Sequence, residues 1–159
     1  MRCKERLEAY LREHQVPFQI QHHAQSFSAQ RIAESEHIPS KMVAKTVIIV
    51  ADHHLFALVL PASFRVDLDK IQDILRAKEI RLAHEAEFAS TFPDCEVGTM
   101  PPFGNLYGIP VYIDIRLTEE EAIVFPAGTS TETMSLKYAD FERLVQPRTV
   151  TFARTHPVV

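Results

Sequence analysis

The chain has 159 residues, of which 46% are hydrophobic and 24% charged, with a formal net charge of −4. This composition predicts one globular domain spanning residues 1–159. No apolar stretch approaches the roughly 20 residues of a membrane helix and the N-terminus is charged, so we expect a cytoplasmic protein without membrane contact. The acidic balance argues against DNA binding and against a protein that holds nucleic acid mainly through phosphates, although contact with one short RNA end stays open.

Apolar spacing predicts helices and strands that interleave along the chain. In the first half, the expected elements are a helix over residues 3–11, a strand over 18–21, a short helix capped by Ser28 and ended by Pro39, and a hairpin of the runs 43–50 and 55–60. In the second half, they are a helix capped by Asp67, a short helix over 85–92, strands over 111–115, 122–125 and 134–136, a helix over 138–145 and a strand over 150–152. This order predicts an α+β fold with a mixed central β-sheet.

Lys45 is the only charged residue in the apolar run over 43–50. Alternation along a strand places it on one face with Val43, Val47 and Ile49. A buried lysine needs a partner, and the loss of hydration lowers its pKa. One interpretation is a cation aimed into a cleft, where it holds an anionic or carbonyl oxygen. The other is a lysine near a strand end whose amine reaches water.

Three of the four glycines lie within residues 98–108, around Pro101-Pro102. Glycine serves where φ is positive or where something must approach the backbone closely, and prolines stiffen their neighbours. The glycine-rich loop, defined here as residues 98–104, therefore has two interpretations. Its N–H groups stabilise a developing oxyanion, or it is a stiff connection between elements. The fourth glycine lies in the turn 126–131 beside three hydroxyl residues, which line a polar pocket or form an ordinary turn.

Cysteines and histidines give no metal pattern. The two cysteines, Cys3 and Cys95, predict neither a disulfide framework nor a metal site in a reducing compartment. Adjacent histidines, as at 22–23 and 53–54, point to opposite faces of a strand, and no second histidine follows His84-Glu85 at zinc-protease spacing. We therefore expect no metal, and because no phosphate-loop or dinucleotide fingerprint occurs, the sequence gives no sign of an organic cofactor either.

Several segments of the sequence occur in the order that is typical of one protein family. They are His22-His23-Ala24, Phe27-Ser28-Ala29, Val43-Ala44-Lys45-Thr46-Val47, the stretch 98–104, Ala127-Gly128-Thr129 and Tyr138-Ala139-Asp140-Phe141. Over roughly residues 5 to 150 the chain resembles the YbaK superfamily of aminoacyl-tRNA editing deacylases. That superfamily includes the insertion domain of bacterial prolyl-tRNA synthetase and its free-standing relatives.

The resemblance implies a single α+β domain around a mixed, barrel-like sheet flanked by helices. It also implies hydrolysis of the ester between a wrong amino acid and the terminal ribose, on tRNA for proline carrying alanine, cysteine or serine. The partners implied are the tRNA 3′ end and an aminoacyl-tRNA synthetase. It makes Lys45 catalytic, and we expect this residue to project into a cleft bounded by the 98–104 backbone and the 128–130 turn. The substrate-binding residues implied are His23, Ser28, Thr46, Gly98, Thr99, Pro101, Pro102, Phe103, Gly104, Gly128, Thr129 and Ser130.

Two positions depart from the family pattern. In the family that the chain resembles, free-standing members usually carry asparagine and histidine where this chain has Pro126 and Ser130. The alternative is therefore a homologue with weakened catalysis that binds a small molecule or the acceptor end of tRNA.

Overall fold

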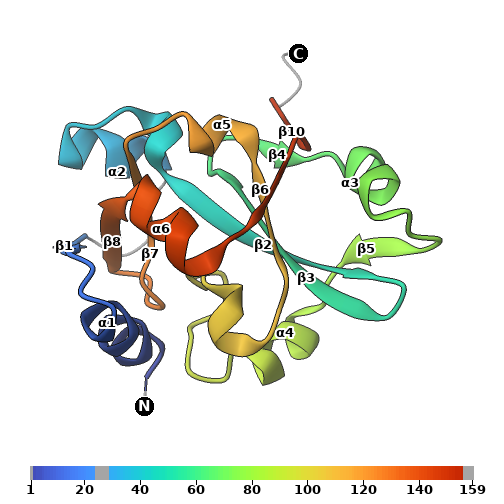
Figure 1. Ribbon diagram of the computed structural model, residues 1–159, viewed down its shortest axis with the longest axis horizontal. Helices are drawn as coiled ribbons and strands as arrows, with labels where there is room; N and C mark the ends of the chain where they lie inside the picture. Colours follow the sequence, from blue (N-terminus) through green and yellow to red (C-terminus); the bar gives the residue numbers. More distant parts are fainter. Residues whose placement is uncertain (1, 24–28, 156–159) are drawn as a thin grey trace.

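The computed structural model describes residues 2–23 and 29–155 (Figure 1). The helices are α1 (Cys3–Glu13), α2 (Ala29–Glu36), α3 (Leu68–Leu75), α4 (Glu85–Thr91), α5 (Ile115–Thr118) and α6 (Tyr138–Val145), with 3-10 turns η1 (Ser40–Met42) and η2 (Gly104–Tyr107). The strands are β1 (Gln19–His22), β2 (Ala44–Ala51), β3 (His54–Pro61), β4 (Arg65–Val66), β5 (Ile80–Leu82), β6 (Val111–Asp114), β7 (Ala122–Pro126), β8 (Glu132–Lys137), β9 (Arg148–Val150) and β10 (Ala153–Arg154). Within the described ranges, no helix is both long enough and apolar enough to cross a membrane.

The main sheet has five strands in the order β5-β2-β3-β6-β9. Strands β5, β2 and β3 pair antiparallel, whereas β3, β6 and β9 pair parallel. A second, antiparallel sheet has the order β1-β8-β7, and a parallel bridge between Val43 and Val124 links it to the start of β2. Strands β4 and β10 form a separate two-stranded ribbon. These pairings, with helices around the sheets, confirm the predicted α+β fold with a mixed sheet.

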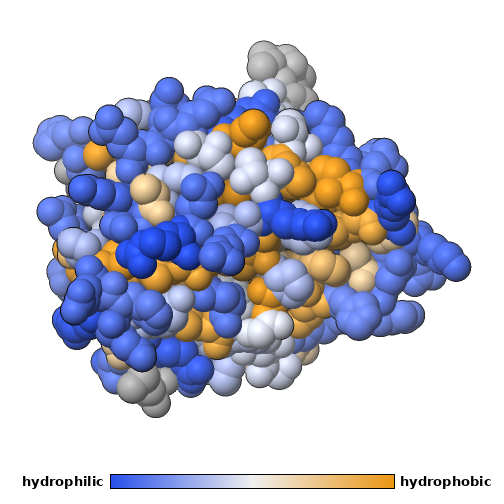
Figure 2. All heavy atoms as spheres, viewed as in Figure 1, coloured by the Kyte–Doolittle hydropathy of each residue, from blue (hydrophilic) through white to orange (hydrophobic). Residues whose placement is uncertain are grey.

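The five-stranded sheet separates two apolar cores. On one face, Ala44 and Ile48 of β2 pack in a large cluster with Phe103 and Phe125. On the other face, Ile49 packs with residues of β3, α3 and the C-terminal segment, namely Leu58, Leu60, Ile71 and Phe152. Side chains alternate across a strand, so neighbouring residues of β2 enter different cores. Figure 2 shows that charged residues surround apolar surface that stays exposed near the middle of one face and toward α3.

Asp114 explains two differences from the predicted strands. The strand expected over 111–115 ends one residue earlier, because the Asp114 carboxylate accepts the Arg116 N–H at 3.0 Å and begins α5. Its other oxygen accepts the N–H groups of Phe152 and Ala153 at 2.9 and 2.7 Å. Of the strand expected over 150–152, only Val150 lies in a strand, at the end of β9, and residues 151–152 form the segment before β10 that this fully buried carboxylate holds.

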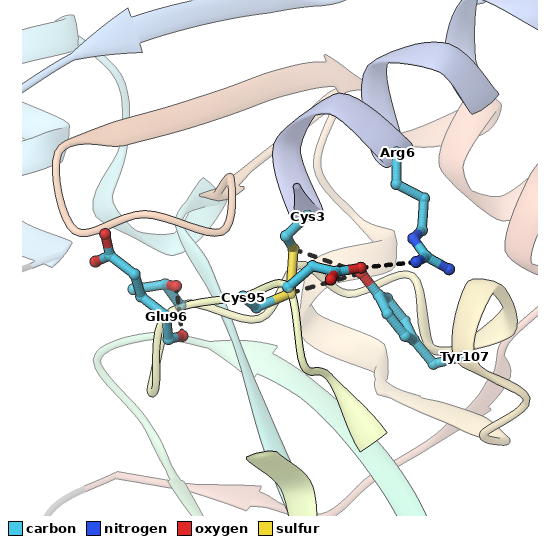
Figure 3. Close-up of a disulfide and its surroundings, with 7 residues drawn as sticks. Cys3, Arg6, Cys95, Glu96 and Tyr107 are labelled. Atoms are coloured by element: carbon cyan, nitrogen blue, oxygen red, sulfur yellow. Dashed lines mark hydrogen bonds and ion pairs between the residues drawn. A yellow bond between two sulfur atoms is a disulfide. The ribbon is translucent and has the colours of Figure 1, made fainter. Parts of the chain in front are cut away.

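The expectation that the cysteines do not pair is wrong. Cys3 at the start of α1 forms a disulfide with Cys95, which precedes the glycine-rich loop (Figure 3). The Tyr107 hydroxyl lies 3.6 Å from each sulfur, and Arg6 binds Asp94 at 2.7 Å beside them. The sequence separation of 92 conceals this proximity, because it arises only when α1 packs against the loop.

Candidate functional site

Lys45 lines a pocket of about 430 Å³ on the face of the main sheet that α3 covers. Strand β2 contributes Lys45 and Val47 to this pocket, which we call the Lys45 pocket. Its other walls are the ribbon β4–β10, through Arg65 and Arg154, and the first turn of α3, through Leu68 and Asp69. In the ladder, Lys45 lies opposite Leu60, a member of the α3-side core, which fixes the face to which its side chain belongs.

The Lys45 pocket is rich in unpaired cations. Burial lowers the pKa of Lys45 below its ordinary value of 10.5, and the nearby charge of Arg65 lowers it further. In the described part of the chain, none of Lys45, Arg65 and Arg154 forms an ion pair with a carboxylate. The carboxylates of Asp67 and Asp69 also line the pocket, and that of Asp67 accepts the Lys70 N–H at 3.2 Å as the predicted cap of α3, so the three cations leave a net positive charge of about one. This pocket can therefore hold an anionic or polarised oxygen.

The glycine-rich loop lies on the opposite face of the main sheet. Met100 and Phe103 belong to the core that contains Ala44 and Ile48, and Pro101, Pro102 and Gly104 are buried as well. None of the residues 98–104 and 128–130 lines the Lys45 pocket, so the cleft expected between them and Lys45 is not seen at this pocket, and their substrate-binding roles stay predictions. The physical reason is the alternation in β2, which sends Lys45 and the loop's packing partners to different sides.

Hydrogen bonds join the glycine-rich loop to the turn that contains Gly128. The N–H of Gly128 donates to the Thr99 carbonyl at 3.0 Å, and the N–H of Glu96 donates to the Gly128 carbonyl at the same distance. The N–H of Thr99 donates to the Glu96 carbonyl, and that of Ser130 to the Glu96 carboxylate at 2.9 Å. The N–H groups of Thr99, Gly128 and Ser130 are thus already engaged within the protein, which supports a structural role for them.

Two glycines in this region should respond differently to substitution. Gly98 has φ of +81° and a Cβ added there would meet open space, whereas at Gly128, with φ of +92°, a Cβ would lie 2.7 Å from the Cys3 Sγ. We expect Gly98→Ala to cost about 1–2 kcal/mol of unfolding free energy from backbone strain alone. Gly128→Ala should cost about 1–3 kcal/mol more, because the methyl overpacks the disulfide. Urea unfolding of both variants measures the difference, and equal losses would contradict this packing.

The remaining predicted binding residues are spread over several places. Thr46 follows Lys45 in β2, and its buried hydroxyl has no hydrogen-bond partner among the described residues. His23 places Nε2 at 2.9 Å from a Glu36 carboxylate oxygen and 3.1 Å from the Thr133 hydroxyl. Ser28 lies outside the described residues, so its predicted capping and binding roles stay predictions.

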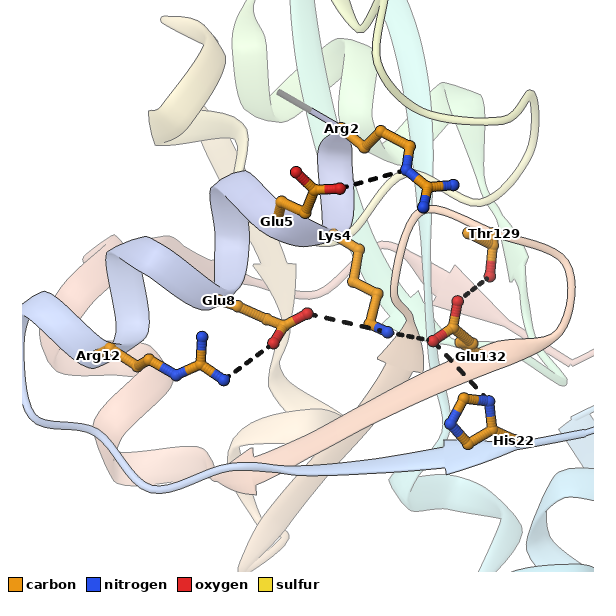
Figure 4. Close-up of polar contacts among 8 residues, drawn as sticks. All are labelled: Arg2, Lys4, Glu5, Glu8, Arg12, His22, Thr129 and Glu132. Carbon is orange, nitrogen blue, oxygen red and sulfur yellow. Dashed lines mark hydrogen bonds and ion pairs between the residues drawn. The ribbon is translucent and has the colours of Figure 1, made fainter.

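Thr129 belongs to a second pocket, of about 150 Å³, between α1 and the turn after β7. Its hydroxyl donates to Glu132 at 3.2 Å, and Lys4 pairs with the same carboxylate (Figure 4). Lys4 also lies 3.9 Å from Glu8, which pairs with Arg12. The charges of this network are therefore matched inside the protein, in contrast to those of the Lys45 pocket.

Arg65 and Arg154 are the pocket residues that the sequence did not reveal. They are 89 positions apart by their numbers, and only the pairing of β4 with β10 brings them together. Two single arginines, each in a two-residue strand, carry no periodic signal. Among residues 2–23 and 29–155, no three His, Cys, Asp or Glu side chains gather as a metal site would require.

Comparisons with known proteins agree with this fold. A family model described as an aminoacyl-tRNA editing domain matches residues 23–144. The multifunctional Ser/Thr-tRNA deacylase ProXp-y of Escherichia coli K12 is 31% identical over 105 residues, which are 65% of this chain and 62% of that protein. The chain thus matches less than two thirds of that relative's length. A proline–tRNA ligase of Leuconostoc citreum is 27% identical over 113 residues, covering 69% of this chain and 19% of the ligase.

Among solved structures, a candidate trans-editing enzyme for prolyl tRNA synthetase superimposes with a TM-score of 0.83. The match covers 96% of this chain and 97% of that one, at 16% sequence identity. At that identity the similarity establishes the fold.

Proposed function

The chain belongs to the aminoacyl-tRNA editing domain family, and from this premise we propose that it hydrolyses the ester of mischarged tRNA, with Lys45 as the catalytic residue. The observation that carries the proposal is the position of Lys45. A half-buried amine with a lowered pKa and without a carboxylate partner in the described residues faces a pocket of about 430 Å³. An arrangement of this kind costs stability unless a ligand uses the charge.

The proposed reaction needs little chemistry from the protein. Water adds to the ester carbonyl, the tetrahedral intermediate carries a negative oxygen, and its collapse releases the free amino acid and the ribose hydroxyl. A neighbouring ribose hydroxyl relays the proton from water to the leaving oxygen. The Lys45 ammonium stabilises the oxyanion, and the pocket walls position the carbonyl.

For the substrate we propose tRNA for proline that carries a small wrong residue, namely alanine, cysteine or serine. A synthetase pocket separates amino acids that differ by one methylene only by about 10–200-fold, so a second hydrolytic step has a use. The relatives support this direction, because one is a Ser/Thr-tRNA deacylase and another a proline–tRNA ligase. We further propose that the protein acts in the cytoplasm and that a synthetase is a partner. The substrate-binding roles of the residues in the glycine-rich loop and of Thr46, His23 and Thr129 stay predictions.

The test is single-turnover release of labelled amino acid from a panel of tRNAs charged with alanine, cysteine, serine, threonine or proline. We expect release from at least one small mismatched residue and none above the uncatalysed rate from Pro-tRNA for proline. If no charged tRNA is hydrolysed while a short acceptor-end RNA still binds, the chain is a binding module. Pro126 and Ser130, which depart from the family pattern, are the positions that favour this second candidate.

A further inference from the structure

We propose that Arg65 and Arg154 together bind a phosphate group of the polynucleotide chain next to the ester. The proposal rests on the proposed function and extends it from the reacting ester to the way in which the substrate is held. The ligand chemistry is a phosphodiester of single-stranded RNA at the edge of the Lys45 pocket.

The two arginines are held face to face by the ribbon. Arg65 in β4 and Arg154 in β10 are direct partners in the antiparallel register. Like charges directly opposite one another on two strands destabilise the pairing. Neither guanidinium has a carboxylate partner in the described part of the chain, and both residues are exposed. An anion between them would offset this repulsion.

Lys45 adds a third cation to the same pocket. An aminoacyl ester brings a positive α-amino group and no free carboxylate, so the amino acid itself does not supply the anion that this wall requires. The phosphates of the RNA chain supply this anion. The planar guanidinium group of arginine binds phosphate oxygens in a bidentate manner. The chain as a whole carries a net charge of −4. The pocket wall thus carries three cations beside the carboxylates of Asp67 and Asp69, a small local excess of positive charge that favours one defined phosphate contact over a broad basic surface.

The test uses the whole protein and an unacylated, 5′-labelled single-stranded oligoribonucleotide, with fluorescence anisotropy at several KCl concentrations. We expect Arg65→Gln and Arg154→Gln each to weaken binding about 10-fold. Each should also reduce the slope of log K against log salt by up to about 0.7, the value for one phosphate on a single strand. The double variant should lose little more than either single variant, because both side chains hold the same phosphate. Arg148→Gln, which removes an exposed arginine outside the pocket, is the matched control and should change neither quantity.

Two further measurements identify the source of the phosphate and check that the variants are folded. Inorganic phosphate and a mononucleotide, titrated alone, should bind far more weakly than the oligoribonucleotide; equal affinity would assign the wall to a small phosphate ligand and overturn the proposal. Melting temperatures of the variants should equal or exceed the wild-type value, since a repulsion is removed. Unchanged affinity and salt slope in both folded variants would also overturn it. Because the RNA is not acylated, this outcome is independent of whether the protein hydrolyses an ester.

Discussion

Replacing Lys45 with alanine is expected to lower the single-turnover rate of ester hydrolysis by about 10²–10³-fold, the usual effect of removing one group that stabilises an oxyanion. The melting temperature should stay the same or rise slightly. The reason is that the ammonium is partly desolvated and repelled by Arg65, so the folded protein loses an unfavourable charge. Rapid-quench hydrolysis assays and thermal unfolding of the same preparation measure both quantities.

The control for this variant is Lys41→Ala. Lys41 lies outside the Lys45 pocket, and its exposed amine is 3.8 Å from Glu120. It should keep wild-type turnover. The pH profile gives a second check: a charged Lys45 is required, and its pKa is lowered, so turnover should begin to fall at a pH below that at which an ordinary lysine titrates. Wild-type turnover in Lys45→Ala would remove the lysine from the reaction.

Removing the disulfide is expected to cost about 4–5 kcal/mol of unfolding free energy, on the chain-entropy estimate for a loop of this length. The bridge joins two cysteines at a sequence separation of 92 and ties α1 to the segment that precedes the glycine-rich loop. Urea unfolding of the oxidised wild type and of the Cys3→Ala/Cys95→Ala double variant measures the difference.

Reduced wild type is the control for the disulfide, because it keeps both sulfur atoms and loses only the cross-link. It should approach the double variant in stability. The Lys45 pocket lies on the other face of the main sheet, so turnover of the folded, reduced protein should be close to that of the oxidised form. An unfolding free energy that does not change on reduction would show that the bridge does not form in solution.

Local signals in the sequence predicted most of the secondary structure. The apolar runs indicated the β2–β3 hairpin, and Asp67 marked the start of α3 because an aspartate before an amphipathic segment has one favoured role. The hairpin turn is shorter than the segment left between the expected strands. It consists of Asp52 and His53, which have positive φ of 47° and 71°, and His54 already belongs to β3. Strand β5 was not predicted, because it is a three-residue edge strand that pairs with β2 and has no apolar run.

The features that the sequence did not reveal depend on contacts between segments that are far apart in the chain. The period of two in β2 placed Lys45 correctly with Val47, yet which core that face meets depends on α3 and on the ribbon β4–β10. The same pairing brings Arg65 to Arg154, and the packing of α1 brings Cys3 to Cys95. The sequence showed that glycines cluster in the glycine-rich loop, but it did not show why each position needs glycine. The need for glycine has a different cause at each position: Gly98 adopts positive φ, whereas a Cβ at Gly104 would lie 2.8 Å from a Val111 methyl.

In the proposed reaction, the ester is bound and cleaved in the Lys45 pocket. The most direct measurement is a crystal structure of the chain with a 3′-aminoacylated RNA end in which an amide replaces the ester. We expect the acyl carbonyl within hydrogen-bond distance of the Lys45 Nζ, on the α3 side of the main sheet, with a phosphate between Arg65 and Arg154. An acyl group seated against residues 98–104 and 128–130 on the opposite face, away from Lys45, would contradict this expectation.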